Sequence, residues 1–166
     1  MSTWDEFAEQ APVLSQYLLA RLDDEATGRI TYVATVRKDG GPRVHPVKVF
    51  LSGGHLRLFM YPESPKGADL IRDPRYAMHA AVTPNPFLSG ELAAHGTARI
   101  ETDPEARALA AAEAPFAAPP PDDNTLFSLD LDLVIGAWAA DGAPARMRWR
   151  AGEGPERDIG FGGRAS

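Results

Sequence analysis

The chain has 166 residues, 44% of them hydrophobic, which fits a single globular domain with a substantial core. The absence of cysteine excludes disulfides, thiolate catalysis and zinc or iron–sulfur sites with Cys ligands. A formal net charge of −6 and a pI near 5.2 argue against a nucleic-acid-binding protein, because phosphate backbones are bound by basic faces.

No apolar run approaches the ~18–20 residues that a membrane span needs. The N-terminal residues MSTWDEF are acidic, whereas a secretory signal begins with basic residues. We therefore expect a cytoplasmic protein that has no membrane partner.

The N-terminal part of the chain predicts two helices. Thr3 and Glu6 have the spacing of a capping box, and Pro12 interrupts the helix that they open. After Pro12, leucines recur at four-residue spacing, which predicts an amphipathic helix packed on an apolar surface. These leucines are Leu14, Leu18 and Leu22.

Strand-forming residues dominate the next part of the chain. Residues 29–37 read RITYVATVR, rich in β-branched and aromatic side chains, and the Asp-Gly-Gly that follows favours a hairpin turn. Residues 44–51 are expected to be the returning strand and residues 56–61 a third, with glycine turns between them. We expect these three strands to form an antiparallel meander.

The remainder of the chain predicts more strands and two further helices. One helix begins at Ser64 and ends before Pro74, since the residue before a proline is pushed out of the helical region. The other covers residues 103–113, and the further strands are expected at residues 76–83, 91–102, 126–140 and 146–150. Because no βαβ units repeat, we expect a small antiparallel barrel with helices outside, formed by residues 1–151 and followed by a flexible tail, 152–166.

The start of the helix at Ser64 is a candidate anion site. Ser64 is a good N-cap, Pro65 suits the first helical position, and Lys66 and Gly67 follow with free backbone N–H groups. Such an end attracts anions, although its dipole contributes only about 0.3–1 kcal/mol at an exposed site. Lys66 adds a fixed cation. An ordinary helix start with a solvated lysine would show the same residues.

The first extended segment of the hairpin that precedes this helix carries the other candidate residues, Arg43, His45 and Lys48. Pro46 cannot donate to a ladder, so it belongs at a sheet edge, a bulge or a gap in pairing. Free backbone groups beside it could pair with the polar edge of a ring ligand, or Pro46 could only guard an ordinary edge against aggregation. We interpret the stretch as a hairpin that lays a flat ligand along one strand and holds its phosphate at the helix start.

A metal site is not expected. The chain has four histidines, but no helical His-x-x-x-His pair and no clustered carboxylates accompany them. They are His45, His55, His79 and His95. Among them, His45 is the best placed to line a ligand.

An ordered set of motifs resembles the pyridoxamine 5′-phosphate oxidase-like family of FMN-binding split barrels. The motifs are ATVRKDGGPRVHPV, the glycine hairpin, SPKGADL with RDPRYAMH, and HGTAR followed by a DPE helix start, and they cover roughly residues 14–113. The resemblance implies a mainly β (α+β) fold, an antiparallel six- to seven-stranded split barrel with peripheral helices. It also implies a homodimer with FMN bound at the subunit interface.

By this resemblance, Arg43, Ser64 and Lys66 hold the phosphate of FMN. Lys48 falls where the family often keeps a cation near the flavin or the substrate. Glu91 falls where the true pyridoxamine phosphate oxidases have an amide side chain that contacts the flavin. A carboxylate at this position accepts hydrogen bonds but does not donate them. The strand residues expected along the flavin ring are Val44, His45, Pro46 and Val47.

The arginine and histidine cluster with which the true oxidases recognise their substrate is not evident. Arg146, Arg148 and Arg150 alternate as on a strand face. We therefore predict an FMN-binding oxidoreductase whose small-molecule substrate and electron donor are unassigned. One alternative is a deazaflavin-dependent reductase of the same fold, whose longer acidic tail needs more cations than Lys66. Another is a non-catalytic flavin- or haem-binding protein.

Overall fold

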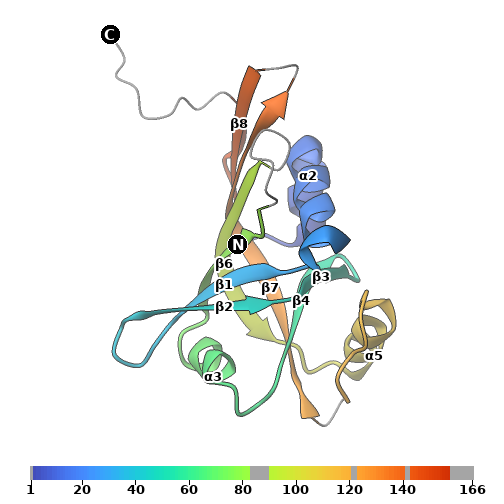
Figure 1. Ribbon diagram of the computed structural model, residues 1–166. Coiled ribbons are helices and arrows are strands. Elements are labelled where there is room, and N and C mark those ends of the chain that lie inside the picture. Colours follow the sequence, from blue (N-terminus) through green and yellow to red (C-terminus); the bar gives the residue numbers. More distant parts are fainter. Residues whose placement is uncertain (1, 83–89, 121–122, 141–142, 158–166) are drawn as a thin grey trace.

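The computed structural model describes residues 2–82, 90–120, 123–140 and 143–157 (Figure 1). Its helices are α1 (Trp4–Gln10), α2 (Pro12–Leu22), α3 (Pro65–Arg72) and α5 (Pro104–Glu113), with one 3-10 turn, η1 (Glu25–Thr27). Its strands are β1 (Thr31–Val36), β2 (Pro42–Val47), β3 (Val49–Ser52), β4 (His55–Met60), β5 (Arg75–Ala80), β6 (Glu91–Ile100), β7 (Thr125–Ala140), β8 (Ala143–Arg150) and β9 (Gly154–Arg157). None of the described helices is long and apolar enough to cross a membrane.

All nine strands belong to one antiparallel sheet. The main order is β2-β1-β5-β6-β7-β4-β3, and β8 and β9 extend it beside the second half of β7. β2 and β3 are the two ends of this order, yet Lys48 alone separates them in the chain. The sheet is therefore strongly curved, as in a split barrel, and the fold class predicted from the sequence is confirmed.

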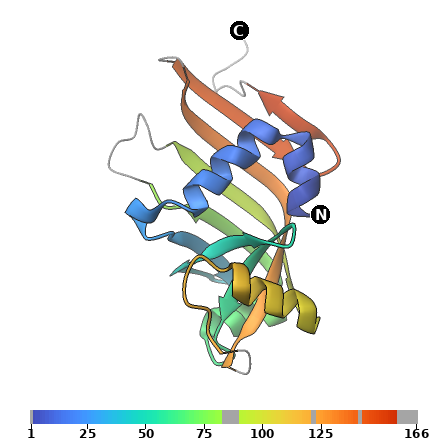
Figure 2. The same ribbon diagram turned by 90° about the vertical axis from the view of Figure 1, so that its right-hand side faces the viewer.

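Helices α1 and α2 lie across the inner face of the sheet (Figure 2). The leucine spacing of α2 explains this placement, because Leu14, Leu18 and Leu22 are all buried in the core. Thr3 and Glu6 form the predicted capping box of α1. Trp149 of β8 is fully buried against the N-terminal helices and donates from Nε1 to Gln10 Oε1 at 3.0 Å. The helices thus complete the core that the curved sheet leaves open.

The strand expected over residues 44–51 is in fact two strands. β2 ends at Val47, Lys48 lies between, and β3 begins at Val49. Among the described strands, β2 pairs only with β1, whereas β3 pairs with β4, and β4 pairs in turn with β7. The two antiparallel pairings of the predicted meander are confirmed, but its single continuous middle strand is wrong. The physical reason is curvature: the chain passes at Lys48 from one edge of the sheet to the other.

The segment expected to be a loose tail contains a further strand. Residues Gly154–Arg157 form β9, which pairs with β8 from Met147 to Arg150. Ion pairs from Arg148 to Glu156 and from Arg150 to Glu153 join the two strands across their turn. The rest of the predicted tail, residues 158–166, lies outside the described residues.

A bulge in β6 brings two backbones close together. The register with β7 shifts between His95 and Gly96. A Cβ atom at Gly96 would lie 1.8 Å from the carbonyl oxygen of Asp130, so only glycine fits there. This position is the glycine of the HGTAR motif.

Candidate functional site

The start of α3 is built as the sequence predicts. Ser64 is the N-cap and its Oγ accepts a hydrogen bond from the backbone N–H of Gly67 at 3.1 Å, with Pro65 in the first turn. Gly67 is buried, and a Cβ atom there would lie 2.9 Å from Ser64 Oγ. Lys66 is half-buried and makes no hydrogen bond or ion pair with any described residue. The start of α3 is therefore a capped helix end with Lys66 in its first turn, although the hollow beside it, described below, is lined by Pro65 and not by the side chains of Ser64 or Lys66.

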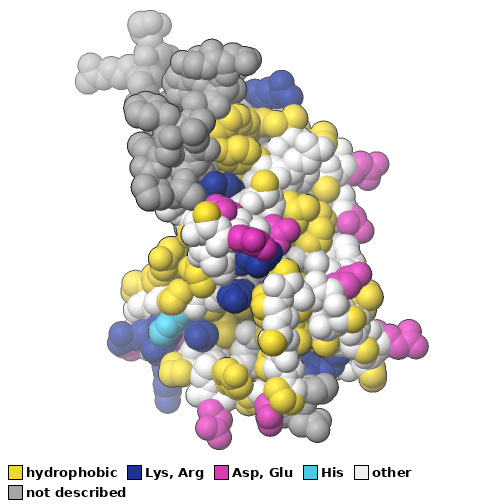
Figure 3. Space-filling view, turned by 45° about the vertical axis from the view of Figure 1, so that its right-hand side comes forward, with side chains coloured by type: hydrophobic (Ala, Val, Ile, Leu, Met, Phe, Trp, Pro, Cys, Tyr) yellow, Lys and Arg dark blue, Asp and Glu magenta, His cyan; other side chains and the backbone are white. Residues whose placement is uncertain are grey.

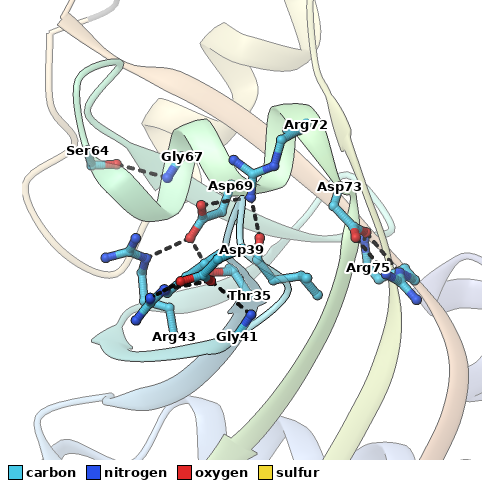
Figure 4. Close-up of polar contacts among 12 residues, drawn as sticks. Thr35, Asp39, Gly41, Arg43, Ser64, Gly67, Asp69, Arg72, Asp73 and Arg75 are labelled. Atoms are coloured by element: carbon cyan, nitrogen blue, oxygen red, sulfur yellow. Dashed lines mark hydrogen bonds and ion pairs between the residues drawn. The ribbon is translucent and has the colours of Figure 1, made fainter.

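Arg43 of β2 reaches α3 through a buried carboxylate (Figure 4). Its Nε donates to Asp69 Oδ2 at 2.6 Å, and the Asp69 side chain is only 4% exposed. Thr35 of β1 donates from Oγ1 to the same oxygen at 3.0 Å, and Arg72 Nη2 donates to Asp69 Oδ1 at 3.0 Å. Arg72 also donates to the carbonyl of Val36. One aspartate thus joins two strands and the helix.

These hydrogen-bond donors stabilise the ionised form of the Asp69 carboxylate. Burial alone would raise the pKa of the Asp69 carboxyl, but hydrogen bonds from Arg43, Arg72 and Thr35 together keep that pKa below its ordinary value. Asp69 is therefore ionised at neutral pH, and its negative charge is matched by two guanidinium groups.

A hollow of about 580 Å³ opens between the β1–β2 hairpin and α3. Pro65 and Ala68 form its helical wall, and four basic and two acidic side chains leave it with a formal excess of two positive charges. The charged side chains are those of Arg37, Lys38, Asp39, Arg43, Asp69 and Arg72. Figure 3 shows Lys and Arg side chains gathered with a His at the left of the molecule, where this hairpin projects. The arrangement suits an anionic group.

Strand β2 forms one edge of the sheet, as Pro46 predicts. Register with β1 places Arg43 opposite Thr35 and His45 opposite Val33, on the inner face, where His45 is half-buried. Val44 and Pro46 point to the outer face and are exposed, and Val47 is buried at the end of the strand. The backbone of these residues is paired with β1 on one side, so its other side has no strand partner among the described residues.

Lys48 lies apart from the hollow. Its Nζ stands 5.1 Å from the centroid of the Phe116 ring, a cation–π contact with the segment that follows α5. The structure therefore brings Arg43 together with the start of α3, and it gives Lys48 an aromatic neighbour elsewhere. Glu91, at the start of β6, is exposed.

The histidines do not gather. His79 and His95 lie on neighbouring strands, where His79 pairs with Ala93 and His95 with Ala77, so they are diagonal neighbours on the outer face. His79 Nδ1 lies 2.7 Å from the carbonyl oxygen of Ala80. In the described part of the chain, no three His, Asp or Glu side chains come together as metal ligands would.

Sequence reasoning missed most of the charged wall of the hollow. Arg72 and Asp69 stand three residues apart on α3, a spacing that places them on one helix face and that signals an ion pair. Arg37 and Lys38 precede the Asp-Gly-Gly turn, and only the pairing of β1 with β2 brings them beside α3. The buried position of Asp69 has no signal in the sequence, because acidic residues in helices are usually exposed.

Comparison with known proteins identifies the family of the chain. The family model described as Pyridoxamine 5′-phosphate oxidase matches residues 23–136, a range that contains β2, α3 and the whole hollow. No curated protein sequence matches the chain.

Solved structures share the fold at low sequence identity. PhzG from Burkholderia lata 383, in complex with tetrahydrophenazine-1-carboxylic acid, is 16% identical with a TM-score of 0.60 over 93% of this chain and 94% of that one. A haem-binding protein from Mycobacterium smegmatis is 20% identical with a TM-score of 0.56 over 78% of this chain. The match spans 57% of the length of that haem-binding protein.

Proposed function

This chain belongs to the pyridoxamine 5′-phosphate oxidase family, and on that premise we propose that it is an FMN-binding oxidoreductase acting on a small molecule. One observation carries the proposal. Arg43 lies on the edge strand β2, donates from Nε to Asp69, and lines a cationic hollow beside the capped start of α3. This is the chemistry that a phosphate requires.

The residues present fit FMN. Its phosphate would be held by Arg43, Ser64 and Lys66, since an arginine fork, a hydroxyl and an ammonium all donate to phosphate oxygens. The hollow of about 580 Å³ lies within the range of roughly 300–1,000 Å³ usual for ligand sites. Its formal excess of positive charge favours the phosphate dianion.

The ring of the flavin belongs, in this proposal, along β2. An edge strand has backbone groups free on one side, and these supply the donors and acceptors that the polar edge of a flavin pairs with. The backbone of Val44, His45, Pro46 and Val47 would serve this purpose, and the half-buried His45 would lie beside the ring.

The division of labour follows from this arrangement. FMN, when bound, supplies hydride and electron transfer, as flavins do in general. The chain binds the phosphate, orients the ring against the edge strand and excludes water from one side of it. Arg148 pairs with Glu156 of β9 and Arg150 with Glu153 of the β8–β9 turn, which supports leaving the vitamin B6 substrate unassigned here.

The outer face of the sheet supports a homodimer. On this face, residues opposite one another on five adjacent strands are mostly apolar, although an outward antiparallel face is usually polar. Tyr32 and Val44 are 47% and 60% exposed there, and α1 and α2 cover the other face. Two rows of opposite residues across these strands are Val44, Ala34, Ala77, His95 and Leu133, and Pro46, Tyr32, His79, Ala93 and Ile135, of which the two histidines are the polar members. A second copy of the chain would bury them.

A deazaflavin is the second candidate, because the hollow supplies cations that residues 42–69 alone did not reveal. Arg37, Lys38 and Arg72 lie around it in addition to Arg43, and an acidic tail longer than one phosphate would need such a set. A non-catalytic role in flavin or haem binding is also consistent with the fold, which a haem-binding protein shares.

Analysis of the freshly purified protein tests the proposal. Mass spectrometry of the released small molecule should give FMN, and the visible spectrum should show flavin bands. The mass of a deazaflavin, or a haem Soret band in the spectrum, would contradict FMN as the cofactor and would favour the corresponding alternative. Anaerobic bleaching by NADH or NADPH, with recovery in air, is expected of an oxidoreductase, whereas a carrier would stay oxidised.

A further inference from the structure

The Asp69 carboxylate is fully engaged before any ligand arrives. Oδ2 accepts from Arg43 Nε at 2.6 Å and from Thr35 Oγ1 at 3.0 Å, and Oδ1 accepts from Arg72 Nη2 at 3.0 Å. The side chain is 4% exposed. Burying a carboxylate is costly unless its oxygens are hydrogen-bonded to cations, so its position inside this corner calls for an explanation beyond packing.

The way in which Arg43 is held suggests that explanation. Among the described residues, Arg43 makes its only side-chain hydrogen bond through Nε, at the side of the guanidinium. Its two terminal nitrogens remain available, and in Figure 4 they point away from Asp69, below the first turn of α3. The Arg43 side chain is 30% exposed, so a ligand can reach it.

We propose that Asp69 is a positioning residue: it fixes the guanidinium of Arg43 through Nε so that the two terminal nitrogens are set for the anionic end of the ligand. The inference rests on the proposed function. Holding a long side chain in its binding geometry removes an entropic cost from ligand binding. Thr35, buried on β1, fixes Asp69 in turn.

A positioning role and a purely electrostatic role of Asp69 predict opposite changes in ligand affinity when its charge is removed. Asp69 is negative and lies at the wall of the hollow, so an electrostatic effect alone predicts that its neutralisation tightens the binding of a phosphate. Positioning predicts the reverse, because Arg43 would become mobile in its absence. The direction of the change therefore distinguishes the two roles.

The experiment compares FMN with riboflavin, which lacks the phosphate, by quenching of flavin fluorescence. Asp69→Asn should raise the Kd for FMN about tenfold and leave the Kd for riboflavin unchanged, as expected when one charge-assisted contact is weakened. In an Arg43→Ala background, Asp69→Asn should have no further effect on either Kd. Asp73→Asn is the matched control, because Asp73 pairs with the exposed Arg75 at the other end of α3.

A second readout needs no ligand. Arg43 Nε–H should give a slowly exchanging ¹⁵N-resolved signal in the wild type, identified by its loss in Arg43→Ala, and Asp69→Asn should abolish it. If Asp69→Asn does not fold, Thr35→Val removes one support of Asp69 and should raise the Kd for FMN about threefold, with riboflavin unaffected.

The outcomes separate the two proposals. If the wild type binds FMN no better than riboflavin, the phosphate site of the proposed function fails, and the role of Asp69 fails with it. If the wild type prefers FMN and Asp69→Asn keeps or strengthens that preference, only the role of Asp69 is overturned. An equal loss of FMN and riboflavin binding, or a fast-exchanging Arg43 signal in the wild type, also overturns it.

Discussion

Arg43 is the residue on which the proposed phosphate site most depends. It stands on the free edge strand, lines the hollow and has terminal nitrogens without a partner among the described residues. We expect Arg43→Ala to weaken FMN binding by about 10- to 100-fold, because a hydrogen bond to a charged group contributes about 1.5–3 kcal/mol. Titration of flavin fluorescence measures this loss.

Arg75 provides the control for Arg43. Its side chain is 73% exposed and pairs with Asp73 beyond the end of α3, outside the hollow. Arg75→Ala should therefore leave FMN affinity within about twofold of the wild type. Equal losses in the two variants would mean that FMN responds to overall charge and not to a site at Arg43.

Asp69 should also give stability a pH dependence of known sign. Because its pKa is lowered in the folded state, its stabilising effect is complete above the ordinary aspartate pKa of about 3.9 and is lost as pH falls through the lowered value. The wild type should be more stable than Asp69→Asn at pH 7, and this gap should narrow below about pH 4. Urea unfolding from pH 7 to pH 3 measures it, and a gap that stays constant or widens in acid contradicts this assignment.

For single residues, interactions within one helical turn could be predicted from the sequence, whereas contacts between residues far apart in the chain could not. Ser64 caps α3 as its place before Pro65 predicts, since capping depends on residues within one turn. Asp69 was not singled out, because its partners Thr35 and Arg43 are 34 and 26 residues away in the chain. The contact of Lys48 with Phe116 was not foreseeable from spacing either.

Among the elements, the bulge of β6 permits a sharp test. Gly96→Ala would place a Cβ atom 1.8 Å from the Asp130 carbonyl oxygen, which forces two paired strands apart. We expect it to lower the free energy of unfolding by about 3 kcal/mol or more. Gly152→Ala, whose Cβ meets nothing within 4 Å, should cost only the strain of its positive φ, about 1–2 kcal/mol. Denaturant unfolding measures the free energy of unfolding of both variants, and equal decreases in the two would contradict the close approach at Gly96.

The elements themselves were largely readable from the sequence. Hydrophobic spacing, capping residues and glycine turns identified α1, α2, α3 and α5 and most strands, because these signals are local. The pairing of β3 and β4 away from β2 was not readable. A single residue, Lys48, breaks the run of strand-forming residues, and the sequence there contains no turn signal. Only the curvature of the whole sheet requires that break.

At the scale of the whole molecule, the apolar outer face predicts self-association. Tyr32→Asp puts a charge on that face, beside Pro46 and His79 on the flanking strands. Sedimentation should show a wild-type dimer, and this variant should weaken dimerisation at least thirtyfold, since a large aromatic residue buried in an interface contributes about 2 kcal/mol or more.

Val13→Asp is the matched control for the dimer. Val13 is 45% exposed on α2, on the opposite side of the sheet, so this variant should remain dimeric. A wild type that sediments as a monomer, or dissociation caused equally by both variants, would contradict the assignment of the interface to the outer face.

The fold and the family could be predicted from the order of motifs along the chain. The set of residues that forms the candidate site could be identified only in the structure. The motif SPKGADL identified a helix start, but the hollow exists because the β1–β2 hairpin brings Arg37 and Lys38 of its turn and Arg43 of β2 to the same helix. The choice of cofactor depends on that assembled charge and on the free strand edge. It is therefore a property of the folded molecule that no single stretch reveals.

A crystal structure of the protein grown with FMN tests the central claim most directly. We expect phosphate oxygens within about 3 Å of the terminal nitrogens of Arg43 and beside Ser64 at the start of α3. We also expect the flavin ring to lie against the backbone of β2. A phosphate bound elsewhere, or this corner closed by side chains with FMN excluded, would contradict it.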